Sequence, residues 1–498
     1  MDSKALARQQ GDLDAVVWFD TQRVFIGGQW QPGLDGARRL PVENPSTGET
    51  MGEIAAGTGA DVDAAVRAAR TALETGAWGR LTATERGRVL MRMSQLVLER
   101  AEDLALIEAL DVGKPLQQSQ SDARALARYL EFYAGAADKL MGSTIPYQAG
   151  YTVYTLREPW GVAGIIIPWN YPMQIVGRAV GGALAAGNAC VVKPAEDASI
   201  STLAFAAIAE EAGLPAGALN VVTGLGAEAG AALAAHPQVD HLSFTGSMAT
   251  GARIQAAAAQ NAVPVTLELG GKSPYIFFDD GDLDAATPTL VAACMRNAGQ
   301  TCSAASRVLV QRGVYDQVKQ RMVAIYRKLV AAPAVQGRDL GPLVSGRQKD
   351  IVSRYIARGR AELNVAAEGR ISNDAPARGH YVRATLFSEV PPGHALAQEE
   401  IFGPVQVLIP FDDEDDAIRI ANGTPYGLIA GVWTRDGGRQ MRMARRLRAG
   451  QVFINNYGAG GGIELPFGGY GHSGHGREKG FDALYGFTQL KTVAAHHG

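Results

Sequence analysis

Cys302 lies in a stretch of small and polar residues, NAGQTCSAASR (297–307), that has no apolar period. A cysteine in such a setting can act as a nucleophile, because its thiolate adds readily to an electrophilic carbon. Most cysteines of intracellular proteins are instead small buried hydrophobic residues. A nucleophilic role for Cys302 therefore requires a base and an oxyanion stabiliser elsewhere in the chain.

Two other motifs could supply these groups. LELGGKSP (267–274) places Glu268 in an apolar strand. An unpaired carboxylate is costly to bury there. A carboxylate that takes a proton from water benefits from such burial, because burial raises its pKa. The alternative is a structural ion pair, for example with Arg307. PWNYP (168–172) carries Asn170 at the end of a predicted strand. Its amide can donate to a developing oxyanion, or it can simply cap a turn.

Three turns at strand ends could bind a nucleotide. GLGAEAG, from Gly224 to Gly230, has the spacing GxGxxxG, one residue longer than the standard dinucleotide motif. FTGSMATG (244–251) opens a helix whose N-terminus could face a phosphate. KPAE offers Lys193 and Glu196, and a carboxylate there could bind an adenosine ribose and repel a 2′-phosphate. Each signal is weak alone, but three at consecutive strand ends predict a cofactor site.

The elements that carry these motifs alternate between strand and helix. From residue 161, short apolar runs are separated by helical segments, which is typical of βαβ units in a mostly parallel sheet. Such sheets bind ligands at the carboxyl ends of their strands. A second alternating series runs from residue 263 to about 467, residues 60–140 show a helical period, and residues 143–161 resemble a hairpin. We therefore expect an α/β protein with two domains and a small β element.

Composition excludes several classes of protein. The 498 residues suggest two or three domains, and 47 Lys and Arg against 50 Asp and Glu give no electrostatic footprint for nucleic acid or a membrane surface. The three cysteines have neither disulfide nor metal-ligand spacing. The N-terminus lacks an apolar core of a secretory signal, and no long apolar run is present. We expect a cytoplasmic protein without a metal, nucleic-acid or membrane partner.

Seven motifs together are more specific than any one of them. PWNYP, KPAE, FTGS, LELGGKSP, NAGQTC, EEIFGPV and PFGG follow the order and spacing of the aldehyde dehydrogenase superfamily, which the chain resembles from about Val24 to Val493. The resemblance implies two Rossmann-like parallel-sheet domains, a β extension for oligomerisation, and a homodimer or homotetramer. The implied parts are an NAD-binding domain (1–141 and 158–267), a catalytic domain (268–467), and the extension with a C-terminal tail (142–157 and 468–498).

The resemblance also implies oxidation of an aldehyde to a carboxylic acid with NAD as cofactor, NADP remaining possible. Cys302 would form a thiohemiacetal with the aldehyde, and Asn170 with the Cys302 backbone N–H would stabilise its oxyanion. After hydride transfer to the nicotinamide, Glu268 would activate the water that hydrolyses the thioester. The cofactor residues implied are Ile166, Trp169, Lys193, Glu196, Gly226, Gly230, Phe244, Gly246, Ser247, Glu400 and Phe402.

Two arginines narrow the range of aldehydes that we expect as substrate. Arg178 and Arg296 resemble the arginines that hold the distal carboxylate in succinic semialdehyde dehydrogenases, a task that suits the planar guanidinium. The alternative is a salt bridge to a nearby acid such as Glu464. The glycines of GAGGGIE (458–464) suggest a wide pocket wall that would admit an aromatic or medium-chain aliphatic aldehyde. A CoA-acylating or a non-catalytic relative is a weaker alternative. The predicted substrate residues are Arg178, Arg296, Thr301, Ser303, Glu464 and Phe467.

Overall fold

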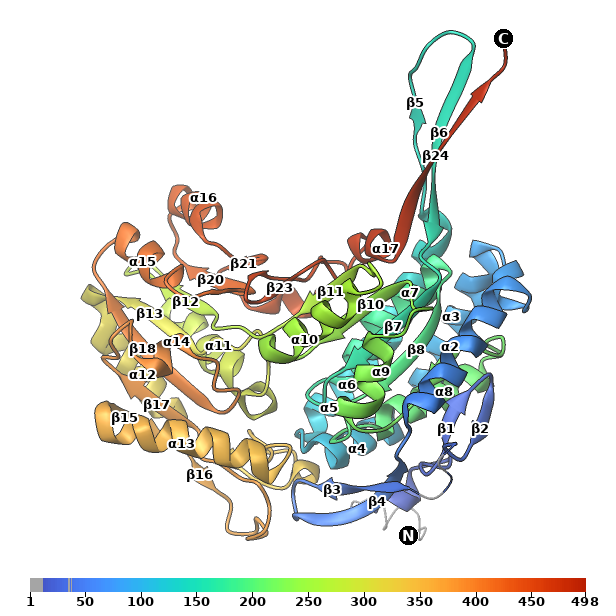
Figure 1. Cartoon of the computed structure of the whole chain (residues 1–498). Coiled ribbons are helices and arrows are strands. Elements are labelled where there is room, and N and C mark those ends of the chain that lie inside the picture. The colour runs from blue at the N-terminus through green and yellow to red at the C-terminus, as the bar shows by residue number, and fades with distance from the viewer. Residues whose placement is uncertain (1–11, 35, 37) are drawn as a thin grey trace.

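A computed structural model describes residues 12–34, 36 and 38–498. Residues 1–11, on which the expectation of no secretory signal partly rests, lie outside the described residues. Two α/β lobes face each other, and a narrow β arm projects away from the first lobe (Figure 1). The chain ends at the tip of the arm.

The first lobe is built on an eight-stranded sheet. Its five central strands pair in parallel, and the strands on either side of them pair antiparallel. The central strands are apolar because helices cover both faces of the sheet. From edge to edge the strands are β2 (Gln29–Gln31), β1 (Val24–Ile26), β9 (Leu219–Val221), β8 (Ala189–Pro194), β7 (Val162–Ile167), β10 (His241–Thr245), β11 (Val265–Glu268) and β23 (Gly474–His475).

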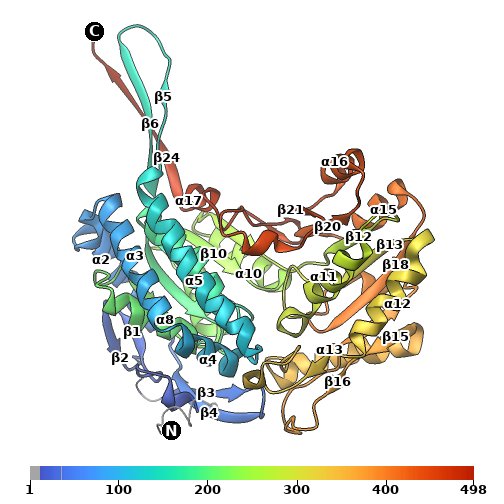
Figure 2. The same ribbon diagram turned by 180° about the vertical axis from the view of Figure 1, so that it is seen from behind.

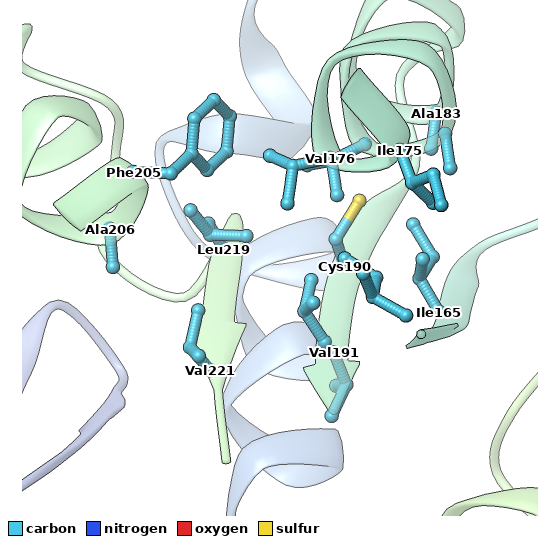
Figure 3. Packing of buried hydrophobic residues seen from close by; sticks show 14 of the residues in the cluster. Ile165, Ile175, Val176, Ala183, Cys190, Val191, Phe205, Ala206, Leu219 and Val221 are labelled. Atoms are coloured by element: carbon cyan, nitrogen blue, oxygen red, sulfur yellow. The ribbon is translucent and has the colours of Figure 1, made fainter. Parts of the chain in front are cut away.

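Helices bury the two faces of this sheet. Cys190 of β8 lies in the resulting core among Ile165, Val176, Phe205 and Leu219 (Figure 3), and burial raises the pKa of its thiol far above the ordinary range. Cys190 is therefore a structural thiol. The helices are α2 (Gly59–Glu74), α3 (Ala83–Glu99), α4 (Ala101–Val112), α5 (Leu116–Ala136), α6 (Pro172–Ile175), α7 (Gly181–Ala186), α8 (Ile200–Glu211), α9 (Ala231–Ala234) and α10 (Met248–Ala259).

The second lobe has a seven-stranded sheet that is parallel except at one edge. Its strands, in spatial order, are β15 (Asn364–Glu368), β17 (Thr385–Ser388), β18 (Val405–Phe411), β13 (Arg307–Gln311), β12 (Pro274–Phe277), β20 (Ile429–Trp433) and β21 (Gln451–Ile454). Its helices are α11 (Leu283–Met295), α12 (Tyr315–Tyr326), α13 (Gly346–Glu362), α14 (Ala395–Gln398), α15 (Glu414–Ala421) and α16 (Gly437–Arg446).

The arm is a three-stranded antiparallel sheet (Figure 2). It consists of β5 (Thr144–Ile145), β6 (Tyr151–Pro159) and β24 (Thr488–His496), so the predicted hairpin is confirmed. The remaining elements are the pairs β3 (Arg39–Asn44) with β4 (Glu49–Ala55), β14 (Val330–Ala331) with β16 (Arg370–Ile371), and β19 (Tyr426–Gly427) with β22 (Tyr470–Gly471), and helix α17 (Asp482–Gly486).

The segment after residue 467 differs from the predicted tail. β22 pairs with the second lobe, β23 joins the first sheet, and only from Thr488 does the chain enter the arm. Gly474 makes this possible, since its φ is +104° and a Cβ there would lie 1.9 Å from the Leu267 carbonyl oxygen. The segment therefore links the two lobes beside Glu268 before it reaches the arm.

The predicted fold class, two parallel-sheet α/β domains with a small β extension, is confirmed. Among the residues that the structure describes, no helix is both long enough and apolar enough to cross a membrane.

Candidate active site

One cavity of about 910 Å³ lies between the lobes. The first lobe contributes Asn170 and Glu268 to its lining, and the second contributes Cys302 and Glu400. The strands of a parallel sheet all point their carboxyl ends to one edge, so residues that follow β7, β10 and β11 meet there. The fold thus gathers the predicted nucleophile, base and amide around one space.

A strained turn positions Cys302. Asn297, Ala298 and Gly299 have left-handed backbone conformations, with φ of 48°, 52° and 79°, which cost energy for residues other than glycine. Hydrogen bonds hold the turn, because the Asn297 amide donates to the Asn170 carbonyl oxygen at 2.9 Å. Burial raises the pKa of the Cys302 thiol to about 12, and the positive charge of Arg178 opposes this shift.

The Asn170 side chain lies against the same turn. Its amide nitrogen donates a 3.0 Å hydrogen bond to the carbonyl oxygen of Gln300, two residues before Cys302. The side chain is buried, at 5% exposure, yet lines the cavity. This placement suits an amide that donates to an oxyanion on the Cys302 adduct, which stays a prediction.

Glu268 ends β11 with a buried carboxyl group, and the residue is 1% exposed. Within the described part of the chain, neither of its carboxyl oxygens has a hydrogen-bond partner. Burial, together with the nearby charge of Glu478, raises the pKa of Glu268 well above its ordinary value, and Arg178 counteracts this. Arg307, the predicted alternative partner, instead donates to three carbonyl oxygens, those of Lys272, Ile420 and Ala421. Glu268 is therefore free to act as a base.

The strand edge of the first sheet also brings together several predicted cofactor residues. Ile166 of β7 pairs with Lys193 of β8 on one side and with Phe244 of β10 on the other. The Lys193 ammonium lies 2.9 Å from a Glu196 carboxylate oxygen, and the Gly226 N–H donates to the other oxygen at 3.3 Å. Burial opposes the charge of Glu196, but Lys193 together with the backbone N–H groups of Glu196 and Gly226 keeps the pKa of Glu196 below its ordinary value. Gly230 lies beside the Lys193 stem, since a Cβ on Gly230 would be 3.8 Å from it, an ordinary van der Waals contact.

The remaining cofactor candidates line the cavity. The rings of Trp169 and Phe402 meet edge to face with centroids 5.3 Å apart. Gly246 lies against the Phe244 ring, and Ser247 caps α10 by accepting the Thr250 N–H.

Glu400 reaches the first lobe from the second. Its carboxylate accepts the Gly271 N–H at 2.8 Å, and a Cβ on Gly270 would lie 2.2 Å from the other Glu400 oxygen. Gly270 must therefore be glycine for Glu400 to take this position. Burial raises the pKa of Glu400 to about 7, against the effect of the Gly271 N–H and the Lys272 charge.

Arg178 is not free to bind a substrate carboxylate, the role that the sequence had predicted for it. Its guanidinium forms a buried ion pair with Glu478 at 2.5 Å and donates to the Thr245 hydroxyl at 3.3 Å. The predicted alternative of a salt bridge is thus what the structure shows, but its acid is Glu478. Glu464 is exposed and pairs with Arg128 instead, and its side chain is not among those that line the cavity.

Arg296 remains available at the cavity. Its guanidinium carbon lies 5.9 Å from the centre of the Tyr457 ring, and the side chain is exposed. The Tyr457 and Ser303 hydroxyl groups form a 3.1 Å hydrogen bond, and the Ser303 and Thr301 hydroxyl groups form one of 3.2 Å. Phe467 also lines the cavity, and the Lys479 nitrogen lies 5.6 Å from the centre of its ring. Tyr457 and Glu478 were missed in the sequence because neither lies in a motif and both reach the site from distant segments.

A strand edge suited to a nucleotide and a half-buried thiol at the same cavity together indicate a cysteine-dependent oxidoreductase of the nucleotide-binding type. Comparison with known sequences identifies the family. The Aldehyde dehydrogenase family profile matches residues 30–493, so the chain belongs to the aldehyde dehydrogenase family and is an NAD(P)-dependent aldehyde oxidoreductase.

Individual relatives agree with this assignment over most of their length. The Arabidopsis thaliana protein named aldehyde dehydrogenase family 2 member B4, mitochondrial, is 44% identical over 95% of this chain and 87% of its own. A Burkholderia cenocepacia structure of the aldehyde dehydrogenase class is 60% identical with a TM-score of 0.94, covering 96% of this chain and 100% of its own. The NAD+ complex of an aldehyde dehydrogenase from Bacillus cereus is 38% identical with a TM-score of 0.94, covering 100% and 99%.

The residues present fit a dinucleotide. Glu196 offers a carboxylate whose pKa is low, as a partner for ribose hydroxyls must be, and Gly246 and Gly270 leave backbone without side chains at the cavity. Glu400, held through Gly271, presents a second carboxylate at the catalytic end. The cofactor would therefore span the edge of the first sheet and end beside Cys302.

Proposed function

We propose that this protein uses NAD to oxidise an acid semialdehyde, an aldehyde that carries a distal carboxylate. The observation that supports this substrate class is Arg296. Its guanidinium lines the cavity that contains Cys302, and no ion pair engages it within the described ranges of the chain. A free guanidinium can bind a carboxylate with two parallel hydrogen bonds. Arg178 cannot take this role while it is paired with Glu478.

The proposed chemistry uses three side chains. The Cys302 sulfur, once deprotonated, bonds to the carbonyl carbon and gives a thiohemiacetal whose oxyanion the Asn170 amide and the Cys302 N–H stabilise. A nicotinamide, when bound, would accept the hydride that leaves the thiohemiacetal carbon, and the carbon that loses the hydride becomes the carbonyl of a thioester on Cys302. Glu268 then takes a proton from water, whose oxygen attacks the thioester carbon, and the carbon–sulfur bond breaks to release the acid and the Cys302 thiol. The buried, unpaired carboxyl of Glu268 supports this assignment.

NAD is favoured over NADP by Glu196. A 2′-phosphate on the adenosine ribose would lie beside this carboxylate, and like charges repel. A Bacillus cereus relative was solved as an NAD+ complex, which supports NAD as a cofactor.

A second candidate substrate is an uncharged aromatic or medium-chain aldehyde. Phe453, Tyr457, Ile463, Leu465 and Phe467 give the cavity an extensive apolar wall. The turn around Gly458–Gly461 makes one side of it from backbone alone, which leaves space for bulk. Such a wall would bind a phenyl or hexyl group without help from Arg296.

The arm supports a proposal about assembly. It exposes large apolar side chains, among them Tyr147, Tyr151, Leu156 and Leu490. Exposed apolar surface of this kind is usually covered in a complex, and we propose a homodimer or homotetramer. The three unpaired cysteines suit the reducing cytoplasm that we propose as the location.

Turnover of three aldehydes tests the substrate class. We compare kcat/KM for succinic semialdehyde, benzaldehyde and hexanal in the wild type, in Arg296→Ala, and in Arg100→Ala as a control whose guanidinium is paired with Glu211 and does not line this cavity. Arg296→Ala should lower kcat/KM for the semialdehyde by ~10- to 100-fold, the loss of a hydrogen-bonded charge pair, and change the other two by less than ~3-fold. An unchanged KM for the semialdehyde in Arg296→Ala would overturn the carboxylate contact and favour the uncharged substrates.

A further inference from the structure

The turn between α4 and α5 carries a lysine that is completely buried. Gly113 ends α4 in the left-handed conformation, with φ of 81°, and Pro115 begins the approach to α5, which leaves one residue, Lys114, between them. The Lys114 ammonium donates a 2.6 Å hydrogen bond to the Glu108 carboxylate and another to Asp122 of α5. Buried ionisable groups are costly to maintain even when paired, so this cluster calls for a function beyond stability.

Two members of the cluster contact the residues that follow Asn170. The Lys114 nitrogen lies 3.9 Å from the centre of the Tyr171 ring, a cation–π contact removed from water. The second carboxylate oxygen of Glu108 accepts the backbone N–H of Met173 at 3.3 Å. The turn that leads out of Asn170 is therefore fixed to α4.

The third member fixes the same turn to α5. The other Asp122 oxygen accepts a hydrogen bond from the Gln174 amide at 2.5 Å. Tyr171, Gln174 and Asp122 all line the catalytic cavity, whereas the Lys114 side chain lies behind them with 0% exposure. Lys114 thus reaches the site only through the residues that it holds.

The opposite side of Asn170 depends on α5 as well. Gln118 of α5 accepts the Asn297 backbone N–H at 2.9 Å, and the Asn297 amide in turn donates to the Asn170 carbonyl oxygen. Together α4 and α5 support both the Asn170 turn and the turn that precedes Cys302. The two helices pack against each other, and α5 also packs against α6.

We infer that Lys114, paired with Glu108 and Asp122, is a positioning residue that fixes Tyr171 and the start of helix α6 and so aims the Asn170 amide at the substrate oxyanion. The inference rests on the proposed function, in which Asn170 is the oxyanion donor. Lys114 does not touch the reacting atoms. A displaced donor loses most of its effect, because stabilisation of an oxyanion requires a close and aligned N–H.

A double-mutant cycle tests this inference. We measure kcat and the KM for NAD in the wild type, Lys114→Met, Asn170→Ala and the double variant, with Arg70→Met as a control that breaks an ion pair with Asp240 elsewhere in the first lobe. Lys114→Met should lower kcat by ~10- to 100-fold in the wild type but by less than ~3-fold once Asn170 is absent. Its KM for NAD should stay within ~2-fold. Arg70→Met should have the same small effect in both backgrounds.

The outcomes separate the inference from the function on which it rests. If Asn170→Ala leaves kcat unchanged, the assignment of Asn170 as oxyanion donor fails. If Asn170→Ala lowers kcat but Lys114→Met lowers it by the same factor in both backgrounds, only the positioning role of Lys114 is overturned. Should Lys114→Met fail to fold, the cycle is run with Glu108→Gln, which preserves volume. Lys114→Arg, which keeps the charge, should recover part of the loss.

Discussion

The Arg178 guanidinium and the Glu478 carboxylate lie 2.5 Å apart in a buried ion pair, and both change the pKa of Glu268. Glu478 also accepts a hydrogen bond from the Ser243 hydroxyl at 2.6 Å. After burial itself, Glu478 is the largest influence that raises the Glu268 pKa, and Arg178 is the largest that lowers it. The pair therefore tunes the proton affinity of the base, and Arg178 is not free to bind substrate.

Replacement of Arg178 should move the pH profile of turnover. Arg178→Met removes the charge that lowers the Glu268 pKa, so the base stays protonated to higher pH and the acid limb of kcat shifts upward. The variant should also lose about 3–5 kcal/mol of unfolding free energy, because the buried Glu478 carboxylate is left without a positive charge beside it. Urea unfolding and kcat between pH 5 and 10 measure both effects. Arg178→Lys retains the charge and should leave the acid limb near that of the wild type; an unmoved limb in Arg178→Met would refute the tuning role.

Glu400 should make stability depend on pH. The pKa of its carboxyl group is 4.5 in an unfolded chain, and burial raises it to about 7 in the folded protein. Between these values the folded protein holds a proton that the unfolded chain has released. The contribution of Glu400 to stability is therefore greatest below pH 4.5 and is lost as pH rises through 7.

The comparison with Glu400→Gln isolates this effect from other titrating groups. The free energy of unfolding of the wild type, relative to Glu400→Gln, should fall as pH increases from 4.5 to 7 and then level off. Chemical unfolding at five or six pH values measures the difference. Parallel curves for the two proteins would show that the Glu400 pKa is not raised.

Glu196 should control the choice between NAD and NADP. Glu196→Ala removes a carboxylate that would face the 2′-phosphate, so kcat/KM with NADP relative to NAD should rise on the order of tenfold, the scale of one like-charge contact. Glu210→Gln, which changes an acid at the far end of α8, serves as control. A wild type that prefers NADP would contradict the cofactor assignment outright.

The alternation of apolar strands and helices was enough to predict both lobes, since parallel sheets are assembled from consecutive βαβ units. The hairpin of β5 and β6 was predicted for a similar reason, its alternating side chains. These features depend on short stretches of chain. Cys302, Glu268 and Asn170 were candidates from their local motifs, whereas their catalytic roles came from the resemblance to the aldehyde dehydrogenase superfamily and stay predictions.

The contacts that sequence patterns could not predict join distant segments. Arg178 and Glu478 are brought together only because the segment after Phe467 returns to the first sheet as β23. That segment has glycine-rich, short strands with no periodic signal, which is why the predicted tail boundary at 468 lies before the chain enters the arm. Tyr457 likewise reaches Ser303 across the second lobe. Such pairs follow from topology rather than from local residue type.

The mass of the enzyme during turnover tests the proposed roles of Cys302 and Glu268 most directly. Glu268→Gln removes the proposed base but should leave thiohemiacetal formation and hydride transfer intact, so kcat should fall by ~10²- to 10⁴-fold. With NAD and succinic semialdehyde, peptide mass spectrometry of Glu268→Gln should then find the acyl group as a thioester on Cys302, stoichiometric with the NADH formed. An acyl group on another residue, or none when NADH is produced, would contradict the proposed roles of Cys302 and Glu268.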